Sequence, residues 1–589
     1  MFLHWIVLFW HGISVMEKKI VRRQFSGEPV QLDDLPPLLQ RVFSLRDIKT
    51  KDDISRELSQ LQPFSLLKNI DAAAARLYQA LVNNEKIIII GDFDADGATS
   101  TTLAVQALRA FGSTQVDFLI PNRFDYGYGL TPEIVEVAKT KKPDLIITVD
   151  NGISSIAGVK VAREAGIDVL ITDHHLVGDH VPEDCIIINP NQDGDNFPSK
   201  CIAGVGVIFY VMLALRAKLK QENWFQEQKL ACPNMAYFLD LVALGTVADV
   251  VPLDKNNRIL VFNGLERIRS GAARPGILAL IEIAGRKYAK MKASDLGYGI
   301  GPRLNAAGRL DDMSRGVECL LSKDYSQAIK LARELDQLNL ERRALESQMQ
   351  EQAFAALDAL NLDGQDRIGV CVYQEDWHQG IIGLVAARVK EKLHRPVVAF
   401  AKESETTIKG SARSVSGLHI RDVLDAMAKR YPHLISKFGG HAMAAGLSIE
   451  TKHFEEFSRA FNEVVSERVT EERLQATVYT DGELDSSYFN LKTAQLLRKA
   501  GPWGQGFPEP LFDGSFAVIE QRLVGSHHLK LLLMATDSDY CIDAIAFNVD
   551  LDKWPNENCG TINAAYRLDV NDFRGREKLQ LLVEELYAT

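Results

Sequence analysis

The stretch IIIIGDFDADGATSTT, residues 87–102, indicates the fold class. Its four isoleucines predict a strand that is buried on both faces, as in a parallel sheet. Three carboxylates follow within five residues, at Asp92, Asp94 and Asp96. Carboxylates this close repel one another unless a cation lies among them or they share protons. The motifs that follow along the chain decide between these two possibilities.

Apolar strands alternate with helical segments from about residue 61 to residue 253. Strands are predicted at residues 86–93, 116–122, 144–152, 167–175 and 185–191, and helices at 98–112, 155–166, 201–219 and 235–251. This alternation indicates β-α-β units and an α/β fold with a parallel sheet. Sites in such sheets gather at the carboxyl ends of the strands, and the polar clusters of this chain lie at those ends.

Three further regions follow the predicted sheet. Residues 324–360 are highly charged and contain neither Gly nor Pro, which predicts a solvent-exposed helix, within residues 325–365, that connects two lobes. A smaller α/β unit is predicted at residues 366–470. Short alternating strands at residues 471–589 predict a small β-barrel, and an OB-fold is the expected type.

Composition is that of a soluble globular protein, and 589 residues are enough for roughly four domains. The net charge of −11 gives no general attraction to nucleic acid, although it allows a local basic groove. Seven cysteines are scattered without a CxxC pair, which argues against a disulfide framework and against a cysteine-ligated zinc site. This usage favours a reducing compartment, and we expect a cytoplasmic protein.

The first fifteen residues, MFLHWIVLFWHGISV, are apolar but shorter than the roughly 20 residues that span a bilayer. They also lack the basic region and the small-residue cleavage site of a signal peptide. We expect the natural start to be Met16 and residues 1–15 to be a non-native extension. The alternative is an extension that associates with a membrane.

Polar side chains follow the later apolar elements in the same way. Asp150 ends one strand, Asp173, His174 and His175 end another, and Asp249 ends an apolar helix. Carboxylates with imidazoles and without thiolates favour Mn²⁺ or Mg²⁺ over structural zinc. So many ligands fit two ions, about 3.5–4 Å apart, which would clamp both oxygens of a phosphoester displacement. Each motif alone is more often a turn, a cap or a surface pair; their shared position favours the metal site.

The motifs GDFDADG, VDNG, TDHH and GTVADVVPL together resemble the four motifs of the DHH phosphoesterase superfamily. Downstream, GPRLNAAGRLDD, KGSARS and FGGHAMAAG narrow the resemblance to the RecJ family of single-strand-specific 5′→3′ exonucleases. The resemblance runs from about Leu35 to the C-terminus. It implies an N-terminal segment at 16–60, a DHH catalytic domain at 61–324, a connecting helix at 325–365, a DHHA1 substrate-binding domain at 366–470 and an OB-fold DNA-binding domain at 471–589.

The same resemblance implies two divalent metal ions, Mn²⁺ or Mg²⁺. Their ligands would be Asp92, Asp94, Asp96, Asp150, His174 and Asp249. Asp94 and Asp96 would each bind one ion and Asp150 would bridge both, whereas Asp92 would either bind or only orient its loop. 

His175 would lie against the substrate phosphate, and Asp173 would orient its neighbours. The implied reaction is in-line hydrolysis of single-stranded DNA in recombination and repair, which releases nucleoside 5′-monophosphates without a protein nucleophile.

Groups that would hold DNA are expected in the second lobe. GSARS places Ser411 and Arg413 in a glycine-flanked loop, and FGGHAMAAG places His441 behind paired glycines. Glycine lets a phosphate approach the backbone, and arginine supplies a bidentate fork; a packing joint between helix and strand is the alternative for FGGHAMAAG. His378 lies in a strand-to-helix loop and is expected to contact the same substrate. Ser411 and Arg413, with Arg123 of the first lobe, are expected to recognise the 5′ end.

In the first lobe, Arg123 and Tyr128 of NRFDYGYG combine a phosphate-binding fork with a stacking surface that suits any base. Tyrosines in such loops are otherwise ordinary turn or core residues. Arg303, Asn305 and Arg309 of GPRLNAAGRL are expected to line a groove wall near the lobe junction. A narrow cleft there would admit one strand and exclude duplex.

Basic residues of the predicted barrel are expected to extend a track for single-stranded DNA, and a solvated strand face is the alternative. They are Lys530, Arg567, Arg574, Arg576 and Lys578. Single-strand-binding protein and a helicase are expected partners, no membrane is expected, and the chain is expected to be a monomer. Two rival functions are a small-molecule phosphodiesterase or pyrophosphatase and a non-catalytic DNA-binding scaffold. The basic and aromatic loops argue against the first rival, and the filled acidic and histidine positions argue against the second.

Overall fold

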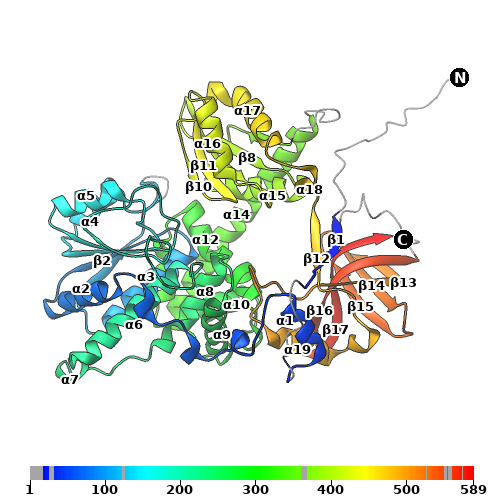
Figure 1. The fold of residues 1–589 in the computed structure, drawn as a ribbon, viewed down its shortest axis with the longest axis horizontal. Helices are drawn as coiled ribbons and strands as arrows, with labels where there is room; N and C mark the ends of the chain where they lie inside the picture. The colour runs from blue at the N-terminus through cyan, green and yellow to red at the C-terminus, as the bar shows by residue number, and fades with distance from the viewer. Residues whose placement is uncertain are drawn as a thin grey trace.

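The computed structural model describes residues 18–25, 32, 34–122, 126–359, 368–525, 527–549, 554, 560–573 and 575–588. They form two α/β lobes and a β-barrel, with the second lobe above the first and the barrel to the right in Figure 1. Residues 1–15, Arg123 and Arg574 lie outside the described residues, so the expectations for them stay predictions. None of the described helices is both long enough and apolar enough to cross a membrane.

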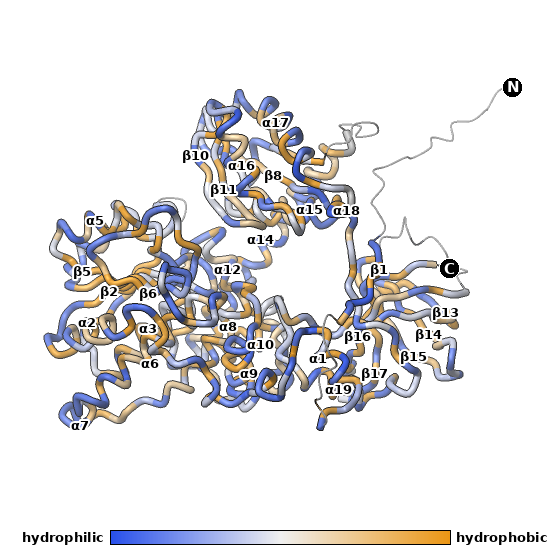
Figure 2. Tube along the Cα trace, in the orientation of Figure 1, coloured by the Kyte–Doolittle hydropathy of each residue, from blue (hydrophilic) through white to orange (hydrophobic). Residues whose placement is uncertain are grey.

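The first lobe contains a sheet of five parallel strands in the order β3-β2-β4-β5-β6, which confirms the predicted fold class. The strands are β2 (Ile87–Gly91), β3 (Val116–Leu119), β4 (Leu145–Val149), β5 (Asp168–Thr172) and β6 (Ile186–Ile188). Every residue of β2 and β4 is buried, because helices cover both faces of the sheet. Ile88 and Ile90 pack towards α4 (Pro132–Lys139) and α5 (Ile156–Glu164), and the alternate isoleucines pack on the opposite face. The strands are accordingly apolar in Figure 2.

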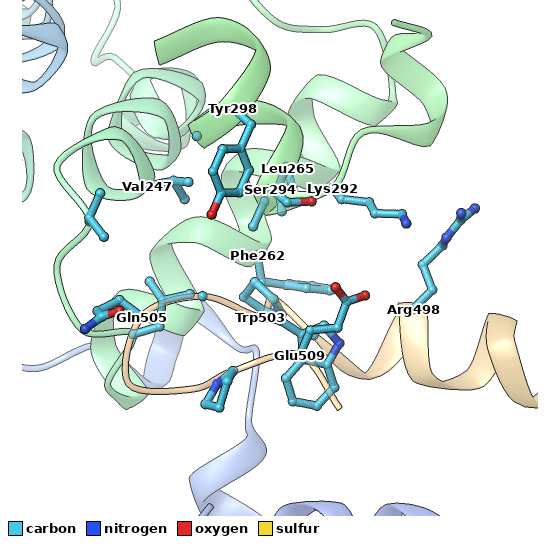
Figure 3. A pocket seen from close by; sticks show the side chains of 18 of the residues that line it. Val247, Phe262, Leu265, Lys292, Ser294, Tyr298, Arg498, Trp503, Gln505 and Glu509 are labelled. Carbon is cyan, nitrogen blue, oxygen red and sulfur yellow. The ribbon is translucent and has the colours of Figure 1, made fainter. Parts of the chain in front are cut away.

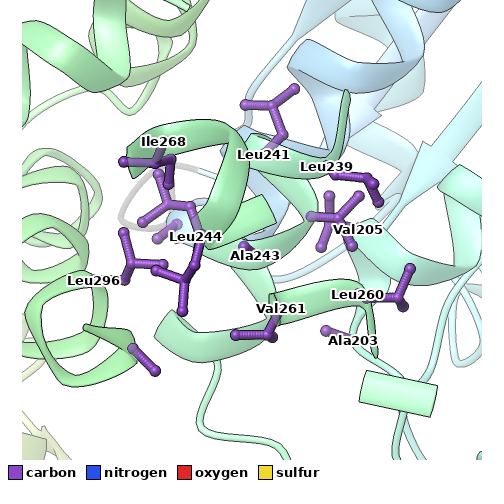
Figure 4. Close-up of a cluster of buried hydrophobic side chains, with 14 of the residues drawn as sticks. Ala203, Val205, Leu239, Leu241, Ala243, Leu244, Leu260, Val261, Ile268 and Leu296 are labelled. Atoms are coloured by element: carbon purple, nitrogen blue, oxygen red, sulfur yellow. The ribbon is translucent and has the colours of Figure 1, made fainter. Parts of the chain in front are cut away.

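Helices fill the rest of this lobe. They are α2 (Ile70–Val82), α3 (Ala95–Ala110), α6 (Gly204–Gln221), α7 (Trp224–Glu227), α8 (Leu239–Ala248), α9 (Lys255–Arg269), α10 (Pro275–Ile283), α11 (Ala293–Asp295), α12 (Gly301–Leu310) and α13 (Ser314–Leu321). Figure 4 shows Leu241 and Leu244 of α8 among apolar side chains of α6 and α9. The segment predicted as one helix at 235–251 is a 3₁₀ turn followed by α8, which stops before Val250 because that residue has φ of 62°. Packing of α8 therefore fixes the position of Asp249, which follows its last residue.

Helix α14 (Tyr325–Ala359) connects the two lobes, as predicted. It is not exposed all round, because one side of it is buried at both ends. Ala332 and Leu335 belong to the core of the first lobe, whereas Ala353 and Leu357 belong to a core of the second. The helix is thus part of both lobes rather than a free spacer.

The second lobe has a mixed sheet in the order β10-β11-β9-β8-β7. Its elements are β7 (Val370–Tyr373), α15 (Ile382–Leu393), β8 (Val397–Lys402), β9 (Thr407–Arg413), α16 (Ile420–Arg430), β10 (Lys437–Gly440), β11 (Ala444–Glu450), α17 (Phe454–Ser466) and α18 (Glu471–Leu474). The prediction of a loop at GSARS is wrong, since Ser411 and Arg413 belong to the central strand β9. Small residues allow this, because the side chains of Phe400 and Leu447 occupy the space beside Gly410. FGGHAMAAG likewise forms an antiparallel hairpin of β10 and β11 rather than a joint between helix and strand.

The C-terminal region is a closed five-stranded barrel, which confirms the predicted OB-like architecture. Its elements are α19 (Leu491–Ala500), β13 (Phe512–Val524), β14 (His528–Ala535), β15 (Cys541–Ala546), β16 (Thr561–Phe573) and β17 (Arg576–Ala588). Strand β1 (Lys19–Arg22) pairs in parallel with β12 (Thr477–Thr480), and α1 (Pro37–Ser44) follows. The buried Arg46 guanidinium then pairs with Asp481 at 2.9 Å, which attaches the start of the chain to the region just before the barrel.

Candidate metal centre

The acidic motif is a turn that runs from β2 directly into α3. Asp94 is the N-cap of α3, and its Oδ1 accepts hydrogen bonds from Asp96 N at 2.9 Å and Gly97 N at 3.0 Å. The helix therefore starts three residues before the predicted position. A Cβ at Gly97 would lie 2.4 Å from the carbonyl oxygen of Asp92, so only glycine fits there. This close turn holds three carboxylates at one strand end.

Asp96, in the first turn of α3, is fully buried against the start of α6. Its two carboxylate oxygens accept hydrogen bonds from Gly204 N at 2.7 Å and Val205 N at 2.9 Å. Burial and the charge of Asp94 nevertheless raise the pKa of Asp96 to about 7. Two amides alone thus do not offset the cost of placing this charge beside another carboxylate.

Asp150 follows β4 and lies at the centre of the cluster. It is buried and has φ of 62°, an uncommon backbone conformation for a residue other than glycine. Burial and the charges of Asp96 and Asp94 raise its pKa well above the ordinary value. The pKa of Asp249 is raised for the same reasons. Four carboxyl groups from three parts of the chain therefore repel one another here.

His174 brings a nitrogen atom into this carboxylate cluster. Its Nε2 lies 3.1 Å from Asp150 Oδ1 and 3.5 Å from Asp249 Oδ2. Both Nε2 and Asp150 Oδ1 are buried without a well-directed hydrogen bond. Burial and the charge of His175 lower the pKa of His174 to about 4, so the imidazole is neutral at neutral pH.

A divalent cation fits these side chains. The side chains form three overlapping groups, and within each group one donor atom per residue lies within 4.8 Å of the others. The groups are Asp92, Asp94 and Asp150; Asp96, His174 and Asp249; and Asp150, His174 and His175. Carboxylate oxygens with neutral imidazole suit Mn²⁺ or Mg²⁺. A cation would also satisfy the two buried atoms that have no hydrogen bond and would reduce the repulsion among the carboxylates.

Asp173 and His175 form a separate ion pair beside this cluster. Asp173 accepts hydrogen bonds from Ile153 N at 2.9 Å and from His175 Nδ1 at 2.7 Å. Burial raises the pKa of Asp173, but its bond to His175 outweighs this and lowers it overall. Burial lowers the pKa of His175, but the hydrogen bond and charge of Asp173 raise it to about 9. His175 is therefore a cation at neutral pH, at the edge of the acidic cluster.

Two asparagines that sequence reasoning missed hold the histidine loop. Asn189 Nδ2 donates to His175 O at 2.9 Å, and Asn191 Nδ2 donates to His174 O at 2.6 Å. Both follow β6, so they lie at the same sheet edge as the acidic residues. The signal was present in the sequence, since NPN follows the apolar run of residues 186–188.

Tyr128, a predicted DNA-binding residue of the first lobe, lies beside the histidine loop. Its hydroxyl is 3.3 Å from His175 Nδ1. Asn305 Oδ1 accepts a hydrogen bond from Ala95 N at 2.7 Å, so this side chain supports the acidic turn. Its expected place on a groove wall stays a prediction. 

The two arginines of the same motif hold neighbouring elements. Arg309 Nη1 donates to Gly380 O at 3.1 Å and thus joins the lobes, whereas Arg303 pairs with Asp336 of α14 at 2.9 Å.

His441 of the second lobe reaches the histidine loop of the first. The centroids of the His441 and His175 rings are 6.0 Å apart. Arg413 Nη1 donates to Ser411 Oγ at 2.9 Å, and both side chains lie against the first turn of α15. His378 Nδ1 accepts from Gly380 N at 3.1 Å in the loop before that helix. The predicted substrate-binding residues therefore gather on the side of the second lobe that faces the acidic cluster.

Three family models match the chain: the DHH family N-terminal domain at residues 86–246, the DHHA1 domain at 366–467 and the RecJ OB domain at 480–585. The single-stranded-DNA-specific exonuclease RecJ of Salmonella typhimurium is 50% identical over 97% of this chain and 99% of its own length. The chain belongs to the RecJ family. RecJ of Escherichia coli is also 50% identical, over 96% of this chain and 99% of its own length. The crystal structure of RecJ from Thermus thermophilus in complex with Mn²⁺ is 28% identical with a TM-score of 0.76, and the match covers 94% of this chain and 78% of that chain.

In this member of the RecJ family, a cavity of about 430 Å³ separates the first lobe from the barrel region. Tyr298, on a π-helix at Leu296–Ile300, is 87% exposed and extends over the loop that carries Trp503 (Figure 3). The basic side chains of Arg498 and Arg567 also line the cavity. Val250, which follows Asp249 of the candidate metal centre in the sequence, also lines the cavity.

Proposed function

We propose that this chain is a metal-dependent exonuclease that degrades single-stranded DNA from the 5′ end and releases nucleoside 5′-monophosphates. The observation that carries the proposal is the convergence of Asp150 Oδ1 and Asp249 Oδ2 on the neutral His174 Nε2, at 3.1 and 3.5 Å. The relatives that share half of its residues are single-stranded-DNA-specific exonucleases, which supports the same substrate here. A related structure that contains Mn²⁺ supports the choice of metal.

Two divalent ions, Mn²⁺ or Mg²⁺, would be held by Asp92, Asp94, Asp96, Asp150, His174 and Asp249. Such ions, when bound, supply a nucleophile from water at neutral pH and stabilise the developing charge of an in-line displacement. The chain contributes the fixed position of the carboxylates. The amides at the starts of α3 and α6 orient Asp94 and Asp96 through four hydrogen bonds, so little reorganisation is needed when substrate arrives.

His175 would hold the scissile phosphate. Its pKa of about 9 keeps it protonated at neutral pH, and its bond to Asp173 fixes the direction of the ring. A charge-assisted hydrogen bond to a phosphate oxygen is shorter and stronger than one from a neutral donor. Tyr128, whose hydroxyl lies 3.3 Å from the His175 ring, would add a second donor or a stacking surface.

The second lobe would close over the same phosphate and bind the 5′ end. His441 lies 6.0 Å from His175 between ring centroids, so a phosphate held by one is within reach of the other. Ser411 and Arg413 are joined by a hydrogen bond of 2.9 Å and would form the fork that binds the terminal phosphate. The space between the lobes would admit a single strand and exclude a duplex by its width.

The remainder of the strand would pass the cavity between the first lobe and the barrel. Tyr298 and Trp503 offer aromatic surfaces there, and stacking on them does not depend on the base. Arg567 would contact the backbone, which extends the track to the barrel. We further propose that the enzyme acts as a monomer in cytoplasmic recombination and repair, with a helicase exposing the strand and single-strand-binding protein covering it.

Oligonucleotides labelled at the 5′ or the 3′ end test this proposal. With Mn²⁺ or Mg²⁺, we expect immediate release of 5′-labelled mononucleotide, gradual shortening of 3′-labelled strands, an intact blunt duplex and no reaction with chelator. Early release of the 3′ label would refute the direction. Binding without any metal-dependent release would favour a DNA-binding scaffold, and cleavage of dinucleotides alone would favour a small-molecule phosphodiesterase.

A further inference from the structure

A second group of metal-ligating side chains lies in the second lobe, outside the acidic centre. It consists of His433, between α16 and β10, and of His453 and Glu456 at the start of α17. One donor atom from each lies within 4.8 Å of the other two. Helix α17 is at the outer end of the lobe, on the side away from the first lobe (Figure 1). The cluster is therefore independent of the proposed cleavage site.

The distances match the spacing of ligands around a small ion. His433 Nε2 lies 3.1 Å from Glu456 Oε1, and His453 Nδ1 lies 3.8 Å from Glu456 Oε2. Two ligands of a tetrahedral zinc ion at ordinary bond lengths are about 3.4 Å apart. The imidazole rings have centroids 5.5 Å apart and planes at 72°, so both can point nitrogen atoms at one point beside the carboxylate.

Charge also favours a cation at this position. In the neutral form that binds a metal, two imidazoles and one carboxylate would together carry a net charge of about −1. The neighbouring basic side chains are paired elsewhere: Arg430 binds Glu467 at 2.8 Å, and Lys452 binds Glu450 at 2.6 Å. Among the described residues, the two histidines are the basic side chains that approach the Glu456 carboxylate.

The backbone that carries the three side chains is held by the core of the lobe. Leu434, next to His433, is 1% exposed, and Phe457, next to Glu456, is fully buried. His453 and Glu456 are three residues apart at a helix start, so their side chains share one face. Ligand positions set by packed neighbours require little ordering on metal binding.

We propose that His433, His453 and Glu456 bind a borderline divalent cation, with Zn²⁺ as the best fit. Two nitrogen donors and one oxygen donor favour Zn²⁺ over Mg²⁺ or Mn²⁺, which prefer oxygen. Three protein ligands leave a fourth position for water. The ion would join the segment before β10 to the first turn of α17 and so clip the outer end of the lobe.

The test uses the full-length chain, stripped with chelator and then saturated with Mg²⁺. Zn²⁺ is titrated in competition with a chromophoric indicator. We expect the wild type to bind one more equivalent of Zn²⁺ than His433→Ala or Glu456→Gln. His419→Ala is the matched control, because His419 also lies near a carboxylate, Asp422 at 3.2 Å, but is not in a ligand cluster among the described residues. It is expected to bind as much Zn²⁺ as the wild type.

Two further readouts separate a metal site from a loss of folding. When Co²⁺ replaces Zn²⁺, the wild type should show visible absorption from the bound ion. In His433→Ala, this absorbance should decrease by the contribution of one bound Co²⁺ per chain. Mg²⁺-dependent cleavage of single-stranded DNA should stay within about twofold of the wild type in His433→Ala and Glu456→Gln, since both residues lie at the outer end of the second lobe (Figure 1). Equal Zn²⁺ binding by wild type and His433→Ala would overturn the proposal and leave a hydrogen-bonded surface cluster.

Discussion

The two lobes meet where His175 and His441 approach each other, but they hold their polar side chains in opposite ways. In the first lobe, Asp96 and Asp150 are almost completely buried at the ends of a rigid parallel sheet. In the second, His441 is exposed in a hairpin next to glycines. The first lobe thus gathers mutually repelling carboxylates away from solvent, whereas the second presents an accessible imidazole beside them. Under the proposed function, the first lobe would cleave the strand and the second would hold it. We therefore expect first-lobe changes to lower kcat and second-lobe changes to raise KM.

The largest effect is expected for Asp150→Ala in the first lobe. The change removes the carboxylate at the centre of the cluster, so kcat on single-stranded DNA should fall by about 10³-fold or more. Binding of the strand should stay within a few-fold of the wild type, because the second lobe is unchanged. Single-turnover cleavage and fluorescence anisotropy measure the two quantities.

Asp168→Asn is the matched control for that variant. Asp168 lies in the same sheet but at the opposite end of β5, where it pairs with Arg76 at 2.7 Å. Its loss should leave kcat unchanged. If Asp150→Ala kept the wild-type kcat, or if both variants lost kcat equally, the carboxyl ends of the strands would not be the site of cleavage.

A smaller effect is expected for Asp173→Asn, which keeps a side-chain oxygen but removes the charge that acts on His175. The pKa of His175, raised to about 9 by Asp173, should fall. Since protonated His175 is the form expected to bind phosphate, activity is lost as pH rises through its pKa, and this loss should occur at lower pH in the variant. We expect kcat/KM at pH 8 to decrease about 10–100-fold.

The pH profile of kcat/KM between pH 6 and 9.5 measures this shift. Partial recovery at the acidic end would support the ion pair. An unchanged profile with a uniform loss would mean that Asp173 only maintains the loop through its backbone hydrogen bonds.

The two lobes also differ in how much of the site could be predicted from the sequence. The first-lobe site was predictable, because parallel strands bring Asp92, Asp150 and Asp173 to one edge whatever their separation along the chain. The approach of His441 to His175 was not, since it depends on how α14 sets one lobe on the other. 

GSARS was misread for a different reason. Its Gly and Ser suggest a loop. In the structure, these small side chains leave room for β9 to lie between β8 and β11. The hydrogen bond from the Asn189 side-chain amide was not predicted, because its acceptor is the backbone carbonyl of His175. Only the folded loop brings these two groups together.

In the second lobe, Arg413→Lys should act mainly on KM. Lysine keeps the charge but loses the planar fork, so KM for a 5′-phosphorylated strand should rise about tenfold with little change in kcat. Arg430→Lys, on α16 and paired with Glu467, is the matched control and should change neither constant. If Arg413→Lys instead lowers kcat alone, the residue belongs with the chemistry and the proposed division between the lobes fails.

The smallest effect is expected away from the contact between the lobes, at Tyr298 on the cavity between the first lobe and the barrel. Tyr298→Ala removes one stacking surface, so KM for a long strand should rise about fivefold, near the lower limit for the loss of one base–aromatic contact. A strand of two or three nucleotides should be cleaved as by the wild type. Tyr288→Ala, an exposed tyrosine that does not line the cavity, is the control. Equal losses on short and long strands would exclude a track through this cavity.

The pairing of β1 with β12 has a consequence for synthesis of the protein. Lys19 pairs with Thr477, so one of the first strands to leave the ribosome has its partner beyond both lobes. The lobes can fold while the chain is still growing, but β1 must stay unpaired until the residues just before the barrel emerge. Strand β1 has two apolar residues between a lysine and an arginine. A strand this short, with a charge at each end, is a poor template for aggregation while its edge is unpaired. Pairing of β1 with β12 must therefore follow the synthesis of both lobes.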